Sequence, residues 1–243
     1  MLNVRYKHIL FDLDGTIYDS LYANTKALYD LLEQKKKDHK ETIESLYRFA
    51  ATPAQESLLS LGFKKEDFDY LIQIWCDGII PYAKEVKPFE HIMAVIAYLK
   101  KAGCHLGIIT SRDRKSASMI GSIASPMPPE LTPYFDIAIC CDDVEHPKPH
   151  GESILKYMQI SGASRDDILY VGDTQTDFEC AQNAGVAFGL ALWGSHLRSS
   201  ISCEHYFVSP WDIVNAVNSV KPREEMWFKW AREIHRANRL NIY

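Results

Sequence analysis

The sequence of 243 residues has no apolar run that approaches the ~18 residues of a membrane-spanning helix. Its first apolar stretch, residues 9–11, is interrupted by Asp12, too early for the hydrophobic region of a secretory signal peptide. The six cysteines include no Cys-x-x-Cys pair and no Cys/His cluster at zinc spacing, so reduced, buried thiols are expected rather than a disulfide framework. These absences predict a soluble, cytoplasmic protein with no membrane partner.

The sequence also lacks a basic stripe of the kind that binds nucleic acid. The net charge is −5, and the one lysine run, residues 35–37, is more typical of a solvated helix face. Nucleic acid is therefore not an expected partner. If the substrate is an anion, a protein of net negative charge has to attract it locally.

The composition is that of a globular protein, with 47% apolar and 24% charged residues, which excludes the disordered and fibrous classes. At roughly 150 residues per domain, the length corresponds to between one and two domains. A large core with a smaller addition fits this length.

Short apolar runs alternate with stretches of helical periodicity after Pro88. This alternation predicts an α/β fold with a doubly wound, Rossmann-like parallel sheet covered by helices on both faces. One of these helices is expected near residues 112–124. The expected strands are residues 8–12, 106–110, 135–140, 168–173 and 187–192.

Residues 17–86 show apolar residues at helical spacing throughout, so this segment is expected to be wholly helical. We therefore expect a discontinuous core of residues 1–16 and 87–243, interrupted by a helical cap domain of residues 17–86. A C-terminal helix near residues 222–238 either packs on the core, the simpler interpretation, or forms an oligomer contact. Its apolar residues at helical spacing are Trp227, Trp230, Ala231 and Ile234.

Two carboxylates, Asp12 and Asp14, stand one residue apart where the first strand ends. Alternate positions of an extended chain face the same way, so both side chains can address one site. Left alone they would repel and raise one pKa, so a cation or a shared proton is expected nearby. Gly15 permits a sharp turn away from the strand.

Other polar residues stand at or just beyond the ends of the later strands, at the edge where open parallel sheets bind ligands. One site is therefore expected to gather four acids, a lysine and hydroxyl groups. Oxygen ligands of this density suit a hard cation, most simply Mg²⁺. The residues that join Asp12 and Asp14 are Thr110, Ser111, Lys148, Asp173 and Asp177.

With these motifs the chain resembles the haloacid dehalogenase-like superfamily of hydrolases. The similarity is to its phosphoglycolate phosphatase-like branch, which carries a helical cap after the first motif. The four motifs occur in order at residues 12–16, Thr110, Lys148 and residues 172–177. The resemblance covers roughly residues 8–215 and implies an Mg²⁺-dependent phosphatase acting on a small phosphorylated metabolite.

The resemblance implies that Asp12 is the nucleophile, which forms an aspartyl-phosphate and also ligates the metal. Asp14 would protonate the leaving oxygen and later deprotonate the attacking water, while its backbone carbonyl ligates Mg²⁺. Asp173 would ligate the metal through its side chain. Asp177 would support the metal's water or Lys148 from one layer further out.

The phosphoryl oxygens would be held by Thr110, the Ser111 N–H and Lys148, since phosphoryl transfer depends mainly on positioning and charge neutralisation. The cap would close over the site and carry the substrate specificity. Tyr18 and Asn24 follow the first motif closely and are candidates to face the substrate, although surface or packing roles are the simpler interpretation.

Asp14 argues against haloacid chemistry, because the metal-free dehalogenases lack this acid. A sugar-phosphate mutase is disfavoured, because Asn24 stands where mutases typically have a histidine. A phosphatase is the preferred function, and a phosphotransferase or mutase and a pyrophosphatase of the same family are the alternatives. A phospho-accepting receiver module is about half as long and lacks the paired acids, and a pseudoenzyme would miss catalytic positions that this chain has.

Overall fold

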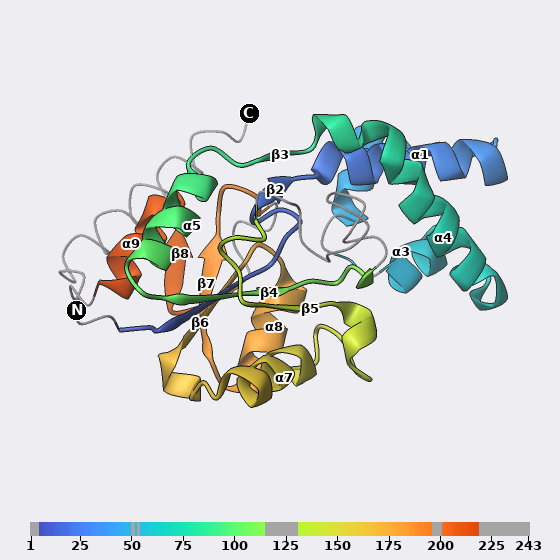
Figure 1. The fold of residues 1–243 in the computed structure, drawn as a ribbon. Helices are drawn as coiled ribbons and strands as arrows, with labels where there is room; N and C mark the ends of the chain where they lie inside the picture. The colour runs from blue at the N-terminus through green and yellow to red at the C-terminus, as the bar shows by residue number, and fades with distance from the viewer. Residues whose placement is uncertain (1–4, 50–51, 53, 115–130, 196–200, 219–243) are drawn as a thin grey trace.

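The computed structural model describes residues 5–49, 52, 54–114, 131–195 and 201–218. Within them six strands form one sheet in the order β5-β4-β1-β6-β7-β8, and every neighbouring pair is parallel (Figure 1). The expected α/β fold with a doubly wound parallel sheet is confirmed. The strands are β1 (His8–Phe11), β4 (His105–Ile109), β5 (Ile137–Ile139), β6 (Ile168–Gly172), β7 (Ala187–Ala191) and β8 (His205–Phe207).

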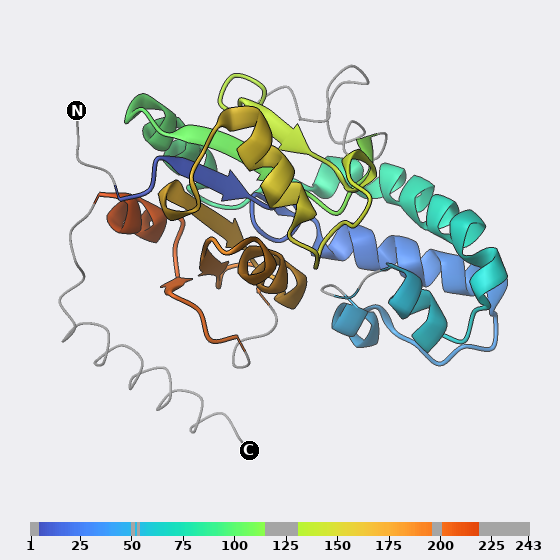
Figure 2. The same cartoon turned by 90° about the horizontal axis from the view of Figure 1, so that it is seen from below.

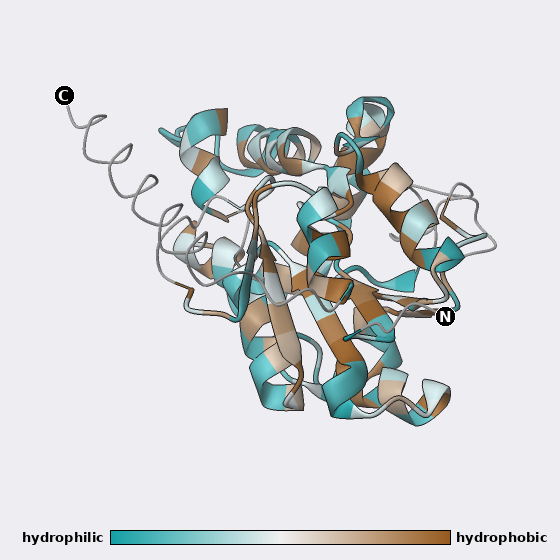
Figure 3. Ribbon diagram, turned by 90° about the vertical axis from the view of Figure 1, so that its left-hand side faces the viewer, coloured by the Kyte–Doolittle hydropathy of each residue, from teal (hydrophilic) through white to brown (hydrophobic). Residues whose placement is uncertain are grey.

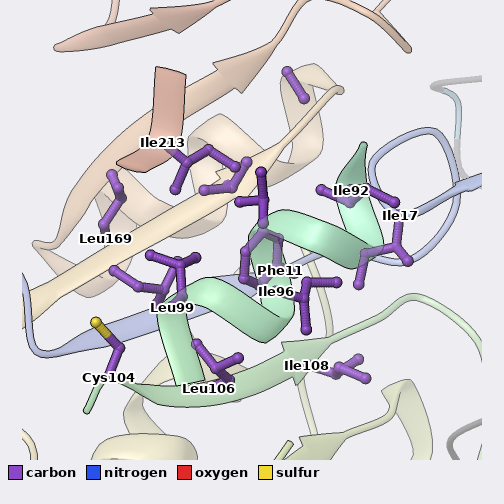
Figure 4. Close-up of a cluster of buried hydrophobic side chains, with 14 of the residues drawn as sticks. Phe11, Ile17, Ile92, Ile96, Leu99, Cys104, Leu106, Ile108, Leu169 and Ile213 are labelled. Atoms are coloured by element: carbon purple, nitrogen blue, oxygen red, sulfur yellow. The ribbon is translucent and has the colours of Figure 1, made fainter. Parts of the chain in front are cut away.

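Helices cover both faces of this sheet (Figures 1 and 2). The helices α5 (Ile92–Lys101) and α9 (Trp211–Val217) lie on one face, and α7 (Glu152–Ser161) and α8 (Gln175–Ala184) lie on the other. Because successive side chains of a strand point to opposite faces, Ile9 and Phe11 pack with α5 while Leu10 packs with α7 and α8. All four residues of β1 are accordingly buried, and apolar residues line the strands and the inward helix faces (Figures 3 and 4).

The strand β1 occupies the point where the strand order reverses, with β4 on one side and β6 on the other. In open α/β sheets ligands bind outside the carboxyl ends of the strands at this point. The fold therefore places the carboxyl end of β1 at the centre of the expected site.

A helical segment lies between β1 and β4 and is grouped beyond the carboxyl ends of the strands (Figures 1 and 2). Leu28, Leu31, Leu71 and Trp75 belong to its own buried cluster, which is separate from the two clusters of the sheet. Its elements are α1 (Leu21–Lys35), α2 (Ile43–Leu46), η1 (Tyr47–Phe49), α3 (Ala54–Ser60), η2 (Lys65–Asp67), α4 (Phe68–Ile79) and η3 (Ile80–Glu85). The division into a core and a cap domain at residues 17–86 stays a prediction.

The expectation that residues 17–86 are wholly helical is wrong at their start. Tyr18–Asp19 form β2, which pairs antiparallel with β3 (Lys87–Pro88), and the Phe89 N–H donates to the Ile17 carbonyl at 2.9 Å. Two-residue strands are too short to leave a periodicity in the sequence. The chain therefore enters and leaves the helical segment side by side.

Two further expectations differ from the structure or lie outside it. The strand β8 was not expected, because its three residues, His205–Phe207, lie in a short segment between polar residues and do not extend into a longer apolar run. Most of the helix expected near residues 112–124 and all of the helix near 222–238 lie outside the described residues. No described helix is long and apolar enough to cross a membrane, and all six cysteines are free thiols.

A partly buried histidine makes the free energy of unfolding depend on pH. A hydrogen bond of 2.9 Å joins the Tyr6 hydroxyl and His205 Nε2, and the imidazole of His205 stacks on Phe207. Burial, assisted by Arg5, lowers the pKa of His205 to about 4. An unfolded histidine has a pKa of about 6.5, so below that pH the unfolded chain takes up a proton that the folded protein does not.

We therefore expect the free energy of unfolding to fall as the pH drops from about 6.5 to about 4. His205→Gln should flatten this fall in urea titrations at several pH values, whereas His150→Gln, at an exposed position, should leave it unchanged. An equally steep fall in His205→Gln would contradict this assignment.

Candidate active site

The first motif forms a tight turn at the carboxyl end of β1. The Asp12 N–H still donates to the Val171 carbonyl of β6 at 2.9 Å, so the side chain of Asp12 leaves from the last paired position of the sheet. Gly15 adopts φ +81°, and a Cβ there would lie 2.2 Å from Asp173 Oδ2. A glycine is therefore needed both for the left-handed backbone and for the close approach of Asp173.

Three buried carboxylates converge at this turn. Oxygen atoms of Asp12, Asp173 and Asp177 all lie within 4.8 Å of one another, and the exposed fractions of the residues are 5%, 8% and 0%. The structure thus brings together the acids that the sequence placed at the ends of two neighbouring strands, β1 and β6.

Lys148 joins two of these acids. Its Nζ donates to Asp12 Oδ1 and to Asp177 Oδ1, both at 2.7 Å, and its side chain is 3% exposed. Burial disfavours the charged amine, but the carboxylates of Asp12 and Asp177 outweigh burial and raise the pKa of Lys148. Lys148 therefore remains an ammonium group fixed against both acids.

Asp177 is held by its own helix as well as by Lys148. Thr174 caps α8, and Asp177 Oδ2 accepts from the Thr174 N–H at 3.1 Å while Oδ1 accepts from the Tyr170 hydroxyl at 2.7 Å. Burial raises the pKa of Asp177, but Lys148 and the hydrogen bonds more than compensate and lower it. Both oxygens of Asp177 are therefore occupied by hydrogen bonds within the protein, and its supporting role at the metal stays a prediction.

Asp12 and Asp173 are in a different electrostatic situation. Burial, with the neighbouring carboxylates, raises the pKa of Asp12 to about 7 against the opposing effect of Lys148. Burial, Asp177 and Asp12 raise the pKa of Asp173 well above its usual value, and the Thr16 hydroxyl donates to its Oδ1 at 3.1 Å. Too little positive charge lies near Asp12 and Asp173 for both carboxylates to be ionised at once. Both can be ionised only when a cation binds beside them.

Asp14 lies apart from this cluster and pairs with an arginine that the sequence reasoning did not include. Arg112 donates from Nε to Asp14 Oδ2 at 2.5 Å and from Nη2 to Oδ1 at 2.6 Å, and the Ser20 hydroxyl donates to Oδ1 at 2.5 Å. Burial raises the pKa of the Asp14 carboxyl, but Arg112 and Ser20 outweigh burial and lower it. The position of Arg112, two residues after Thr110 at the same strand end, was the available signal.

The donor set fits a hard divalent cation. Its available ligands are carboxylate oxygens, which Mg²⁺ prefers. With every group ionised, the four acids and the two cations described above, Lys148 and Arg112, leave a net charge of −2. One divalent cation at Asp12 and Asp173 would balance this charge.

Thr110 and Ser111 follow β4 beside the acids. Thr110 is buried, and its hydroxyl accepts from the Arg112 N–H at 3.2 Å, whereas Ser111 is exposed. Their predicted phosphate contacts stay predictions.

A small chamber of about 50 Å³ lies between the acids and the helical segment. Asp14 and Asp173 lie at its acidic end, and Asn24 belongs to its wall and accepts from Trp75 Nε1 through its backbone carbonyl at 3.0 Å. Tyr18, the other candidate, is 2% exposed and packs instead in the apolar cluster beside α5. The other lining residues are Gly15, Ser20, Leu21, Thr25, Leu28, Leu46, Phe49, Trp75 and Gly194.

Sequence comparison places the chain among known hydrolases. Residues 9–191 match the family of haloacid dehalogenase-like hydrolases, and the chain belongs to this family. Pyrophosphatase PpaX of Bacillus cereus (strain AH820) is 28% identical over 194 residues, covering 76% of this chain and 82% of that protein. Phosphoglycolate phosphatase of Aquifex aeolicus (strain VF5) is 26% identical over 213 residues, covering 87% and 96%.

Solved structures share the fold. A haloacid dehalogenase-like family hydrolase from Streptococcus pneumoniae superposes with a TM-score of 0.73 at 20% identity, covering 87% of this chain and 98% of that chain. A subfamily IA hydrolase of the same superfamily from Geobacter sulfurreducens PCA gives 0.64 at 21% identity, covering 88% and 97%. At these identities the likeness concerns the fold alone.

Proposed function

We propose that the protein is an Mg²⁺-dependent phosphatase that hydrolyses a small phosphomonoester through an aspartyl-phosphate on Asp12. The observation that carries the proposal is the convergence of Asp12, Asp173, Asp177 and Lys148 at the carboxyl end of β1. The family match and relatives named as a phosphatase and a pyrophosphatase support it.

Asp12 is suited to be the nucleophile. Its Oδ1 accepts from Lys148, and no described residue donates a hydrogen bond to its Oδ2. Attack of this oxygen on phosphorus forms an acyl-phosphate bond and breaks the bond to the leaving oxygen. Water then attacks the same phosphorus, which releases inorganic phosphate and restores the Asp12 carboxylate.

Asp14 is suited to move the proton in both steps, because it lies at the acidic end of the chamber that would hold the leaving group. It donates a proton to the leaving oxygen in the first step and takes one from the attacking water in the second. A correctly placed acid–base group contributes about 10²–10⁴ in rate.

The remaining residues position the phosphoryl group and neutralise its charge. Lys148 stabilises charge on Asp12 and the phosphoryl group, Thr110 and the Ser111 N–H bind phosphoryl oxygens, and Asp177 holds Lys148. Asp12 and Asp173 side chains and the Asp14 carbonyl would ligate Mg²⁺. When bound, the cation supplies the positive charge that lets these acids ionise together and draws the phosphate to the site.

A substrate panel tests this function. With Mg²⁺, p-nitrophenyl phosphate and a set of phosphorylated metabolites should be turned over, and kcat/KM ranks the metabolites. A pyrophosphatase or a phosphotransferase, the alternatives within the family, would instead prefer pyrophosphate or transfer the phosphoryl group to another metabolite. Binding without turnover, or a stable phosphoprotein that never releases phosphate, would contradict the proposal.

A further inference from the structure

Arg112 is a largely buried cation at the site, and none of the proposed steps of phosphoryl transfer involves it. Its side chain is 11% exposed, and its guanidinium donates to both carboxylate oxygens of Asp14 in a bidentate ion pair. Because burying a charged guanidinium is costly, we expect Arg112, which lies beside the proton-transfer group Asp14, to have a function of its own.

The present contacts of Asp14 are not those of a group ready to serve a leaving oxygen. Oδ1 accepts from Arg112 Nη2 and from the Ser20 hydroxyl, and Oδ2 accepts from Arg112 Nε. To reach the leaving oxygen, Asp14 has to give up part of this arrangement. A substrate group that binds Arg112 in place of Asp14 would release it.

The group that can replace a carboxylate on a guanidinium is another carboxylate or a phosphate, because the planar fork binds either through two parallel hydrogen bonds. The described residues that line the chamber include two acids and no cation. Lys148 is already committed to Asp12 and Asp177. Arg112 is not among the lining residues, but it holds Asp14, which is. An anionic leaving group would therefore reach its positive partner, Arg112, by taking the place of Asp14.

We propose that Arg112 is a specificity-determining residue that selects substrates carrying a second anionic group, a carboxylate or a phosphate, on the leaving side of the scissile bond. This inference rests on the proposed phosphatase function. On binding, the second anion takes the place of Asp14 on the guanidinium, and Asp14 turns to the leaving oxygen. Binding of the second anion to Arg112 thereby frees Asp14 to protonate the leaving oxygen.

The chain offers a matched control for this arginine. Arg114, two residues further on, makes the same bidentate ion pair with Asp143, from Nε at 2.7 Å and from Nη2 at 2.8 Å. Its side chain is 52% exposed, and it touches none of the four acids of the site. Removing Arg114 therefore removes an equivalent ion pair without touching the proposed selection.

The test compares kcat/KM for three substrates: phosphoglycolate, with a carboxylate on the leaving side, pyrophosphate, with a phosphate there, and p-nitrophenyl phosphate, with neither. In Arg112→Met we expect kcat/KM for phosphoglycolate, for pyrophosphate or for both to fall about 10²-fold relative to kcat/KM for p-nitrophenyl phosphate. This is the size expected for losing hydrogen bonds to a charged group. Which of the two falls identifies the second anion.

Arg112→Lys, which keeps the charge without the fork, should give an intermediate loss, and Arg114→Met should leave the ratios unchanged. If Arg112→Met does not fold, the wild-type enzyme provides the test. It should have a higher kcat/KM for phosphoglycolate or pyrophosphate than for the amide of phosphoglycolate, which keeps the phosphate but has no charged carboxylate. An equal loss on all three substrates, or no preference for the charged substrates in the wild type, overturns the assignment of Arg112 alone. No turnover of any of them overturns the proposed function.

Discussion

Replacing Asp12 by asparagine is expected to abolish phosphatase turnover, with kcat lower by at least about 10⁴-fold. Loss of the nucleophile in hydrolases that form covalent intermediates has effects of this size or larger. The amide cannot form the acyl-phosphate, although its shape and its place between β1 and Lys148 are kept. Steady-state assays with p-nitrophenyl phosphate in Mg²⁺ measure the change.

Asp12→Glu provides the geometric control. It restores the charge but moves the carboxylate by one methylene, so it too should be nearly inactive if attack on phosphorus requires the observed position. Both variants should keep the circular dichroism spectrum of the folded protein. Undiminished turnover in Asp12→Asn would rule out Asp12 as the nucleophile.

Removal of divalent cations is expected to have the second largest effect. Dialysis against EDTA should eliminate turnover and Mg²⁺ should restore it, because Asp12 and Asp173 lack the positive charge that they need when both are ionised. Asp173→Asn should raise the Mg²⁺ concentration needed for half-maximal activity by at least about 10²-fold, since replacing even outer partners of a metal costs 10–100-fold.

Thermal unfolding gives a readout of the metal that is independent of activity. At a concentration about 100 times its Kd, Mg²⁺ should stabilise the wild type by about 2.7 kcal/mol, which corresponds to a rise in Tm of roughly 5–10 °C. Asp173→Asn should lose this rise, while Asp166→Asn, at an exposed site away from the acids, should keep it. Full activity in metal-free buffer would contradict the assignment of Asp173.

The sequence was sufficient to predict five of the six strands of the sheet and the gathering of its acids at one edge. Fully buried strands such as β1 and β6 are continuous apolar runs, and side chains that directly follow parallel strands meet at one edge. Asp12, Asp173 and Lys148 could therefore be assigned to one site although up to 161 positions separate them in the chain.

What the sequence could not predict depends on contacts between segments rather than on periodicity. The pairing of β2 with β3 involves two residues on each side, and the partner of Asp14 is an arginine almost 100 positions away. Ser20 and Tyr170 likewise acquire their roles only when β1, β6 and α1 are placed together. No local pattern distinguishes such residues from ordinary surface or core positions.

The net charge of −5 proves a poor guide to the ligand. Four of the negative charges are gathered in the site, where Lys148 and Arg112 already offset two of them. A divalent cation at Asp12 and Asp173 would balance the rest, so the site would no longer repel a phosphate as the net charge suggests.

The covalent intermediate tests the central claim most directly. The enzyme is mixed with a ³²P-labelled phosphomonoester in Mg²⁺, quenched in acid during turnover, and digested to locate the label. A hydroxylamine-labile label on the peptide that contains Asp12, stronger in Asp14→Asn because hydrolysis of the intermediate is slowed, is the predicted result. Rapid turnover with no label on Asp12 in either protein would contradict the account.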